Sequence, residues 1–196
     1  MLVDMQRPRP PTADRPLSRG LSQWLLCLGL LWLAATGAIA QSVGIHAAQA
    51  VVSDSLSFPA GTAAPRVDLP DDWSLSRPGS SGPVWYRLNF TVPGLRERGD
   101  LLALYIEHVC TNLEVTLNGQ LVHSGGQMSE PITQNCNHPQ LVSLPAALIA
   151  PGLNVLDREV VGHALPQVAS RHRAGALSAL EIGPQSALAG KYARQL

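Results

Sequence analysis

Two adjacent acids, Asp71 and Asp72, stand directly before Trp73, and a second tryptophan, Trp85, follows in the same segment. Paired carboxylates beside tryptophan suggest glycosidic bond cleavage, in which two carboxyl groups lie about 5–10 Å apart across the sugar. Adjacent residues of one loop point apart and are poorly placed for this chemistry. We therefore predict that the acids form a turn before Trp73, whose indole covers the fold.

No other catalytic or metal-binding pattern is present in the sequence. Five histidines lack the spacing of metal ligands, namely His108, His123, His138, His163 and His172. Ser124 and Ser170 lie outside any G-x-S-x-G elbow. The sequence therefore predicts a protein that is not an enzyme, with no metal and no cofactor.

Length and charge limit the function classes. The 196 residues are enough for one domain and a targeting segment, and their net charge is zero. Nucleic-acid binding usually needs an excess of basic residues, so no nucleic-acid partner is predicted.

Residues 1–40 are typical of a secretory signal peptide. Arginines give a basic start, Trp24–Ala35 is apolar, and Ala38–Ala40 forms a small-residue cleavage site. The alternative is an uncleaved membrane anchor, because the apolar run reaches the lower limit for a span. Both interpretations predict an exported, periplasmic protein, tethered to the membrane in the second case.

Two cysteines remain after this segment, Cys110 and Cys136, and an even pair in an exported chain favours a disulfide. In the chain-entropy model a bridge of this separation contributes about 3–4 kcal/mol. The alternative is two buried free thiols.

Short strand-like runs bounded by Pro, Gly, Asn or Asp dominate the sequence after residue 50. In Val84–Val92, the residues Val84, Tyr86, Leu88, Phe90 and Val92 form the predicted core face. Leu113–Gly126 is a predicted hairpin with its turn at Asn118-Gly119. Further strands are predicted at 101–109, 140–145, 154–162 and 175–184. This pattern favours an all-β sandwich or barrel.

Several of these motifs together resemble a known family. Asp71-Asp72-Trp73, the run "WYRLNFTVP" (85–93), the hairpin "LEVTLNGQLVHSGG" (113–126) and "LPAALIAPGLNVLDREV" (144–160) look like the galactose-binding-like jelly roll. This domain stands at the N-terminus of family 2 glycoside hydrolases, where it is not catalytic. The resemblance covers about residues 67–161 and implies a jelly-roll β-sandwich, whose predicted bounds are residues 50–185. Residues 41–49 would form a short lead, and residues 186–196 a short helical tail next to a membrane.

The cysteine pair and the ending "GALSALEIGP" (175–184) look most like the periplasmic sensor region of bacterial membrane histidine kinases and seven-transmembrane receptors. The chain has no second apolar run and no ATP-binding glycine box, so kinase activity is not expected. The leading hypothesis is a non-catalytic sensor domain that recognises a small ligand or a periplasmic protein. The alternatives are a stand-alone carbohydrate-binding module and a structural or assembly domain.

Candidate ligand residues come from the strand at 84–92 and from two polar loops. Arg87 can bind a ligand, although pairing with an acid on a neighbouring strand is the favoured interpretation. Trp73 can stack on a sugar or pack in the core. The loops at 124–140 and 169–178 are the preferred binding surfaces. They contribute the remaining candidates, His123, Gln127, Arg171 and Arg173.

Overall fold

The computed structural model describes residues 42–92 and 100–196, apart from the side chain of residue 172. All of them belong to the second of two units into which the chain divides, Ile39–Leu196. The predicted signal segment, residues 1–40, lies outside the described residues.

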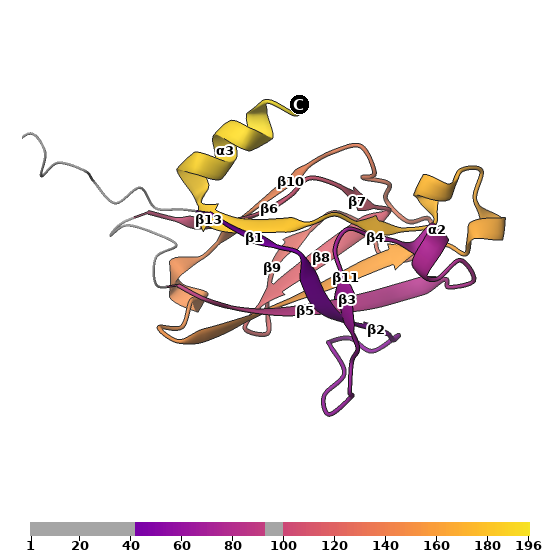
Figure 1. The fold of residues 1–196 in the computed structure, drawn as a ribbon, viewed down its shortest axis with the longest axis horizontal. Helices are drawn as coiled ribbons and strands as arrows, with labels where there is room; N and C mark the ends of the chain where they lie inside the picture. The colour runs from indigo at the N-terminus through magenta and orange to yellow at the C-terminus, as the bar shows by residue number, and fades with distance from the viewer. Residues whose placement is uncertain (1–41, 93–99) are drawn as a thin grey trace, which may run out of the picture. The chain divides into compact units, whose positions relative to one another are not determined.

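The described strands form antiparallel sheets, which appear as an upper and a lower layer in Figure 1. The six-stranded sheet has the order β3 (Arg66–Asp68), β2 (Ala47–Val52), β5 (Gly82–Thr91), β11 (Leu153–Gly162), β8 (Asn112–Leu117) and β9 (Gln120–Ser124). The four-stranded sheet has the order β1 (Val43–Ile45), β13 (Leu180–Pro184), β6 (Leu102–Ile106) and β10 (Gln140–Leu144). A short third sheet joins β4 (Asp71–Asp72), β12 (Ala176–Leu177) and β7 (Val109–Cys110).

Helices are few among the described residues. They are α2 (Trp73–Ser76), α3 (Gln185–Ala193) and the 3-10 turns η1 (Ala146–Leu148), η2 (Leu165–Gln167) and η3 (Arg171–Arg173). No described helix is long and apolar enough to cross a membrane. The all-β prediction is confirmed for the described residues.

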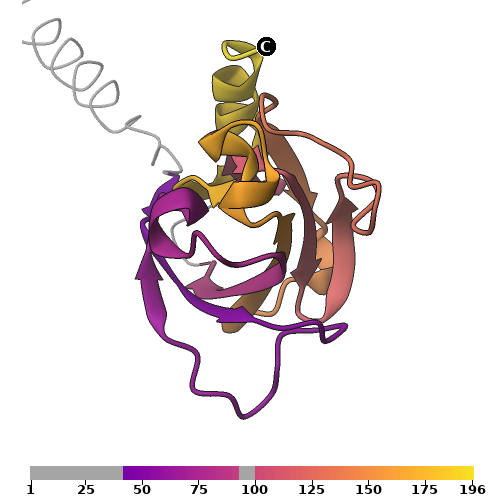
Figure 2. The ribbon, with the colours of Figure 1, turned by 90° about the vertical axis from the view of Figure 1, so that its right-hand side faces the viewer.

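The core lies between the two large sheets, whose ribbons are seen in Figure 2. Alternate residues of the facing strands meet there. Val84, Tyr86, Leu88 and Phe90 of β5 point into it, as the sequence predicts. From the four-stranded sheet, Leu102, Leu104, Ile106, Val142, Leu144 and Ile182 meet them. The predicted turn of the 113–126 hairpin is also confirmed, since Asn118 and Gly119 both have positive φ.

Strands of the sandwich reach into the predicted lead, and the C-terminal helix α3 packs on the sandwich. The predicted lead, residues 41–49, holds β1 and the first half of β2, and these strands pair with β13 and β5 in the two large sheets. The C-terminal helix packs on the four-stranded sheet through Leu188 and Tyr192, which contact Ala103 and Tyr105. Figure 1 shows α3 on the side of this sheet that faces away from the six-stranded sheet.

Trp73 fills a space that two glycines leave open. A Cβ atom on Gly175 would lie 2.3 Å from the indole, and one on Gly162 would lie 2.6 Å from it. Gly175 also has a φ of 135°, in the region that favours glycine. The indole has no exposed surface, and its Nε1 donates to the Tyr86 hydroxyl over 2.7 Å.

The two acids before Trp73 both hold this segment in place. Asp71 is buried and accepts from the Tyr86 hydroxyl at 2.7 Å and the Ser76 hydroxyl at 2.6 Å. It also forms an ion pair with Arg77, whose guanidinium lies 5.5 Å from the Trp73 ring centroid. Asp72 caps α2 by accepting from the Ser74 backbone N–H at 2.9 Å. The predicted acidic turn is therefore confirmed, and burial raises the pKa of Tyr86.

Arg158 is an exception within the core. It lies on β11 opposite Tyr86 and Val115, and its side chain has no exposed surface. Among the described residues, none of its three guanidinium nitrogens has a hydrogen-bond partner. Burial lowers the pKa of Arg158 to about 9. An unpaired charge in an apolar interior is costly, so this side chain lowers the stability of the fold.

Gly175→Ala should lower the free energy of unfolding by about 2–4 kcal/mol, because a methyl group both overlaps the Trp73 indole and meets an unfavourable φ. Urea denaturation followed by tryptophan fluorescence measures the effect. Gly152→Ala is the matched control, since no atom lies within 4 Å of a Cβ atom there and its φ is not positive. Equal stability of both variants would contradict the packing role of Gly175.

Arg158→Met should raise the free energy of unfolding by about 1–3 kcal/mol, since it replaces an unpaired buried charge with an apolar side chain. The measurement is chemical denaturation at neutral pH. Arg173→Met, at an exposed position, should change stability by less than about 0.5 kcal/mol. A loss of stability in Arg158→Met would show that the guanidinium has a favourable partner.

Candidate functional site

Polar residues cross the outer face of the six-stranded sheet, which points away from the core. Cross-strand register places five of them in one line over neighbouring strands. From β8 to β3 they are Thr116, Asp157, Arg87, Gln49 and Arg66. With strands about 4.8 Å apart, this polar row extends over about 19 Å.

Arg87 stands at the centre of the polar row and is held from two sides. Its Nε donates to Asp157 Oδ1 at 2.6 Å and its Nη2 donates to Asp157 Oδ2 at 2.7 Å. Its guanidinium carbon also lies 4.0 Å from the ring centroid of Phe58. The favoured prediction for Arg87, an acid partner on a neighbouring strand, is confirmed. The hydrogen bond to Asp157 raises the pKa of Arg87.

A hollow of about 350 Å³ opens beside Arg87, which we name the arginine groove. Its lining comes from β1, β2, β3 and β5 and consists of Ile45, Ala47, Ala48, Gln49, Arg66, Arg87, Leu88 and Asn89. Among the described residues, the side chains of Gln49, Arg66 and Asn89 make no hydrogen bond or ion pair. The groove therefore offers free donors and acceptors beside a fixed guanidinium.

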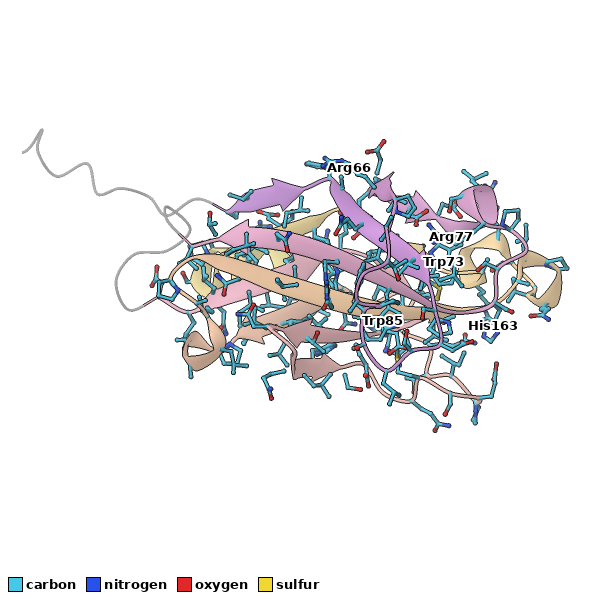
Figure 3. All side chains as sticks on the ribbon, turned by 90° about the horizontal axis from the view of Figure 1, so that it is seen from below. Arg66, Trp73, Arg77, Trp85 and His163 are labelled. Carbon is cyan, nitrogen blue, oxygen red and sulfur yellow. A yellow bond between two sulfur atoms is a disulfide. The ribbon has the colours of Figure 1, made fainter. Side chains whose placement is uncertain are left out.

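The loop of residues 53–65, between β2 and β3, covers the neighbouring part of the outer face. Phe58 is buried against Arg87, and Trp85 donates from Nε1 to the Ser55 carbonyl at 3.1 Å. Figure 3 shows this loop passing in front of the sheet near Trp85, with Arg66 on β3. This cover explains why Trp85 is buried although it points away from the core.

Two carboxylates face each other on the same outer surface. Glu114 on β8 is the cross-strand partner of Glu159 on β11, and Ser124 donates to Glu114 at 2.9 Å. Partial burial and then the neighbouring charge of Glu114 raise the pKa of Glu159. Like charges directly opposite each other destabilise a sheet, so this pair weakens the fold at neutral pH.

A second hollow of about 350 Å³, the end pocket, lies where β5 begins and β11 ends. Its residues are Ser81, Gly82, Pro83, Met128, Ser129, Glu130, Ile132, Val161, Gly162, His163 and Gln167. His163 Nδ1 lies 3.5 Å from Glu130 Oε1. The end pocket thus contains part of the predicted binding loop at 124–140.

The loop at 124–140 is held by a bridge and by buried amides. The predicted disulfide between Cys110 and Cys136 is confirmed. Asn112, which is fully buried, accepts from Asn135 at 2.8 Å and donates to the Gln127 carbonyl at 3.1 Å. A Cβ atom on Gly125 would lie 2.2 Å from Asn112 Oδ1, so the chain must be glycine there.

The predicted ligand residues are not brought together. Trp73 is fully buried, which corrects its assignment as a surface for stacking. Arg171 contacts Ser74 at 3.2 Å and lies 3.8 Å from Asp72, while Arg173 is exposed. Figure 3 shows Trp73 and Arg77 at the end of the domain where His163 lies, away from Arg66.

His123 and Gln127 have local environments that do not form a shared site. Burial lowers the pKa of the His123 imidazole, and its Nε2 has no hydrogen-bond partner among the described residues. The Gln127 amide donates to the Glu130 carbonyl at 3.3 Å within its own loop. In the part of the chain that the structure describes, no group of three or more His, Cys, Asp or Glu residues is placed to hold a metal ion.

Sequence reasoning missed three polar residues of the arginine groove, Gln49, Arg66 and Asn89. Gln49 lay in the predicted lead, and Arg66 stood alone among small residues and prolines with no strand pattern around it. The alternation of Ala48 and Ala50 with Gln49 was the one local signal for β2.

Solved structures share the fold. A family 2 glycosyl hydrolase from Bacteroides cellulosilyticus matches with a TM-score of 0.52 and 14% identity over 72% of this chain and 20% of that chain. A beta-glycosidase from Bacteroides vulgatus matches with a TM-score of 0.53 and 16% identity, over 72% and 20%. The chain thus spans about a fifth of the length of the solved proteins that it matches.

No protein-family model and no curated protein matches the chain. The similarity to family 2 glycosidases agrees with the predicted galactose-binding-like β-sandwich. The resemblance to receptor sensor regions stays a prediction.

Glu159→Gln should stabilise the protein at neutral pH by about 0.2–1 kcal/mol, because it removes a partly buried charge that also faces the like charge of Glu114. Because the pKa of Glu159 is raised in the folded state, ionisation of this carboxyl group lowers the stability of the fold. The penalty is absent below the unfolded-state pKa of about 4.3 and grows as the pH rises through the folded-state pKa. Thermal melts at pH 4 and pH 7 measure this difference.

The control is the same substitution in a Glu114→Gln background, where the gain at neutral pH should shrink. An equal gain at both pH values, or in both backgrounds, would contradict a charge effect between Glu114 and Glu159.

Proposed function

We propose that this domain is a non-catalytic recognition module that binds a carbohydrate in the arginine groove. One observation carries the proposal. The groove places the free side chains of Gln49, Arg66 and Asn89 around the fixed guanidinium of Arg87 on an outer sheet face. Its fold is shared with family 2 glycosidases, which supports a carbohydrate as the class of ligand.

The chemistry of the groove suits a sugar. Carboxamides both donate and accept, so Gln49 and Asn89 can each pair with hydroxyl groups. Arg66 and Arg87 add donors in a planar arrangement. Ile45 and Ala47 add apolar surface to the groove and can contact the C–H groups of a sugar ring, whereas the Leu88 side chain points into the core. Such a mixture of apolar surface and a few polar groups is usual for small-molecule sites.

Both adjacent acids already make hydrogen bonds or ion pairs within the fold, which supports a role without catalysis. Asp71 is occupied by Tyr86, Ser76 and Arg77, and Asp72 caps α2. The disulfide supports an exported protein, because such bridges persist in oxidising compartments.

A second candidate function is the sensor domain of a signalling receptor. The C-terminal helix favours it, because α3 is fixed to the four-stranded sheet by an ion pair of 2.5 Å between Lys191 and Glu181. Lys191 also lies 4.9 Å from the Tyr105 ring centroid. A ligand-dependent shift of this sheet would then move the C-terminal segment. A structural or assembly domain, which binds a protein and no sugar, is the remaining alternative.

A glycan array followed by calorimetry tests the proposed function. The protein should bind at least one oligosaccharide, and Gln49→Ala together with Asn89→Ala should weaken that binding at least about tenfold, the effect of losing about 1.4 kcal/mol. Arg173→Gln, at the other end of the domain, is the control and should bind normally. No sugar bound at millimolar concentration, or equal binding by all variants, would overturn the proposal.

A further inference from the structure

We infer that the saccharide bound by the arginine groove carries a carboxylate, as uronic acids do, and that Arg66 recognises this group. This inference rests on the proposed function and specifies its ligand. It follows from the charge of the groove lining, from the spacing of Arg66 and Arg87, and from the donors that each guanidinium leaves free.

The two arginines of the groove differ in their charge balance. Asp157 neutralises Arg87 through two parallel hydrogen bonds. Arg66 is exposed and makes no ion pair among the described residues. Since the other lining residues are uncharged, the lining itself carries one net positive charge, with the carboxylate of Asp68 outside it on the same strand as Arg66. An anionic ligand with one charge complements it.

The spacing of the arginines suits a single sugar unit. Arg66 and Arg87 are both register partners of Gln49, from opposite sides of β2. Their backbones are therefore about 10 Å apart, twice the distance between neighbouring strands. A sugar ring above Gln49 would have a guanidinium on each side.

The two guanidinium groups also differ in the donors that they can offer. Arg87 gives Nε and one Nη2 proton to Asp157, and Phe58 covers its face, so only its outer edge reaches a ligand. Arg66 retains its whole fork, which matches the two oxygens of a carboxylate. We therefore assign the carboxylate to Arg66 and ring hydroxyls to Arg87.

Asp68 places a negative charge beside the arginine groove. It lies on β3 two residues after Arg66, so both side chains are on the same side of the strand. Its register partner is Ala47, which lines the groove. The charge of Asp68 opposes an anionic ligand, and its removal should strengthen binding.

The experiment compares paired ligands on the full chain. An array carries each uronate-containing oligosaccharide beside its methyl ester, which keeps the shape and loses the charge. Calorimetry then measures the best pair in low salt and in high salt. The uronate should bind about tenfold more tightly than its ester in low salt, and high salt should reduce this ratio.

Three variants assign the preference to a residue. Arg66→Gln should remove the preference for the uronate over its ester, and Arg66→Lys should restore part of this preference because it keeps the charge without the fork. Asp68→Asn should tighten uronate binding only. Circular dichroism and thermal melts verify that each variant is folded.

The outcomes separate this inference from the proposed function. Equal binding of uronate and ester overturns the carboxylate inference and leaves carbohydrate recognition standing. A preference that survives Arg66→Gln overturns the assignment of Arg66. Binding of neither the uronate nor its ester also overturns the carboxylate inference, whereas the proposed function is overturned only if no sugar of any class binds.

Discussion

The position of Trp73 is the constraint on which the rest of the sandwich depends. The indole lies where Gly162 at the end of β11 and Gly175 before β12 both approach it, and its Nε1 donates to Tyr86 on β5. One side chain thus ties the end of β11, the segment that leads into β12, and β5 together. Because β5 and β11 are neighbours over their whole length, this anchor also fixes the alignment of Arg87 with Asp157.

Both faces of the six-stranded sheet carry charged residues that lower the stability of the domain. The interior keeps one unpaired cation at Arg158, and the outer face keeps two carboxylates opposite each other at Glu114 and Glu159. Both features lower stability, and neither is required by the packing around Trp73. Polar groups retained at a cost are common where a protein binds a ligand. The carboxylate pair lies on the same sheet face as the polar row, the face that we propose for recognition.

Local patterns predicted much of the fold and part of the site. The alternation in β5, the Asn118-Gly119 turn and the cysteine pair each depend on residues close in sequence or on a simple count. The sequence allowed the prediction that Arg87 pairs with an acid, although not with which one, because a charged residue in mid-strand meets its neighbours across the sheet. Gln49 and Arg66 were not predictable, since their role depends on which strands pair with β2. The burial of Trp73 depends on glycines far along the chain.

The run Asp157-Arg158-Glu159 directs charges to opposite faces of the central strand β11. A slip of one residue against β5 and β8 would turn Asp157 and Glu159 inward, so the core would hold two carboxylates instead of one guanidinium. It would also separate Arg87 from its partner. A misaligned sheet would therefore lose stability on both of its faces. Arg158 and Glu159 thus make the folded domain less stable, yet together with Asp157 they make its strand pairing unambiguous.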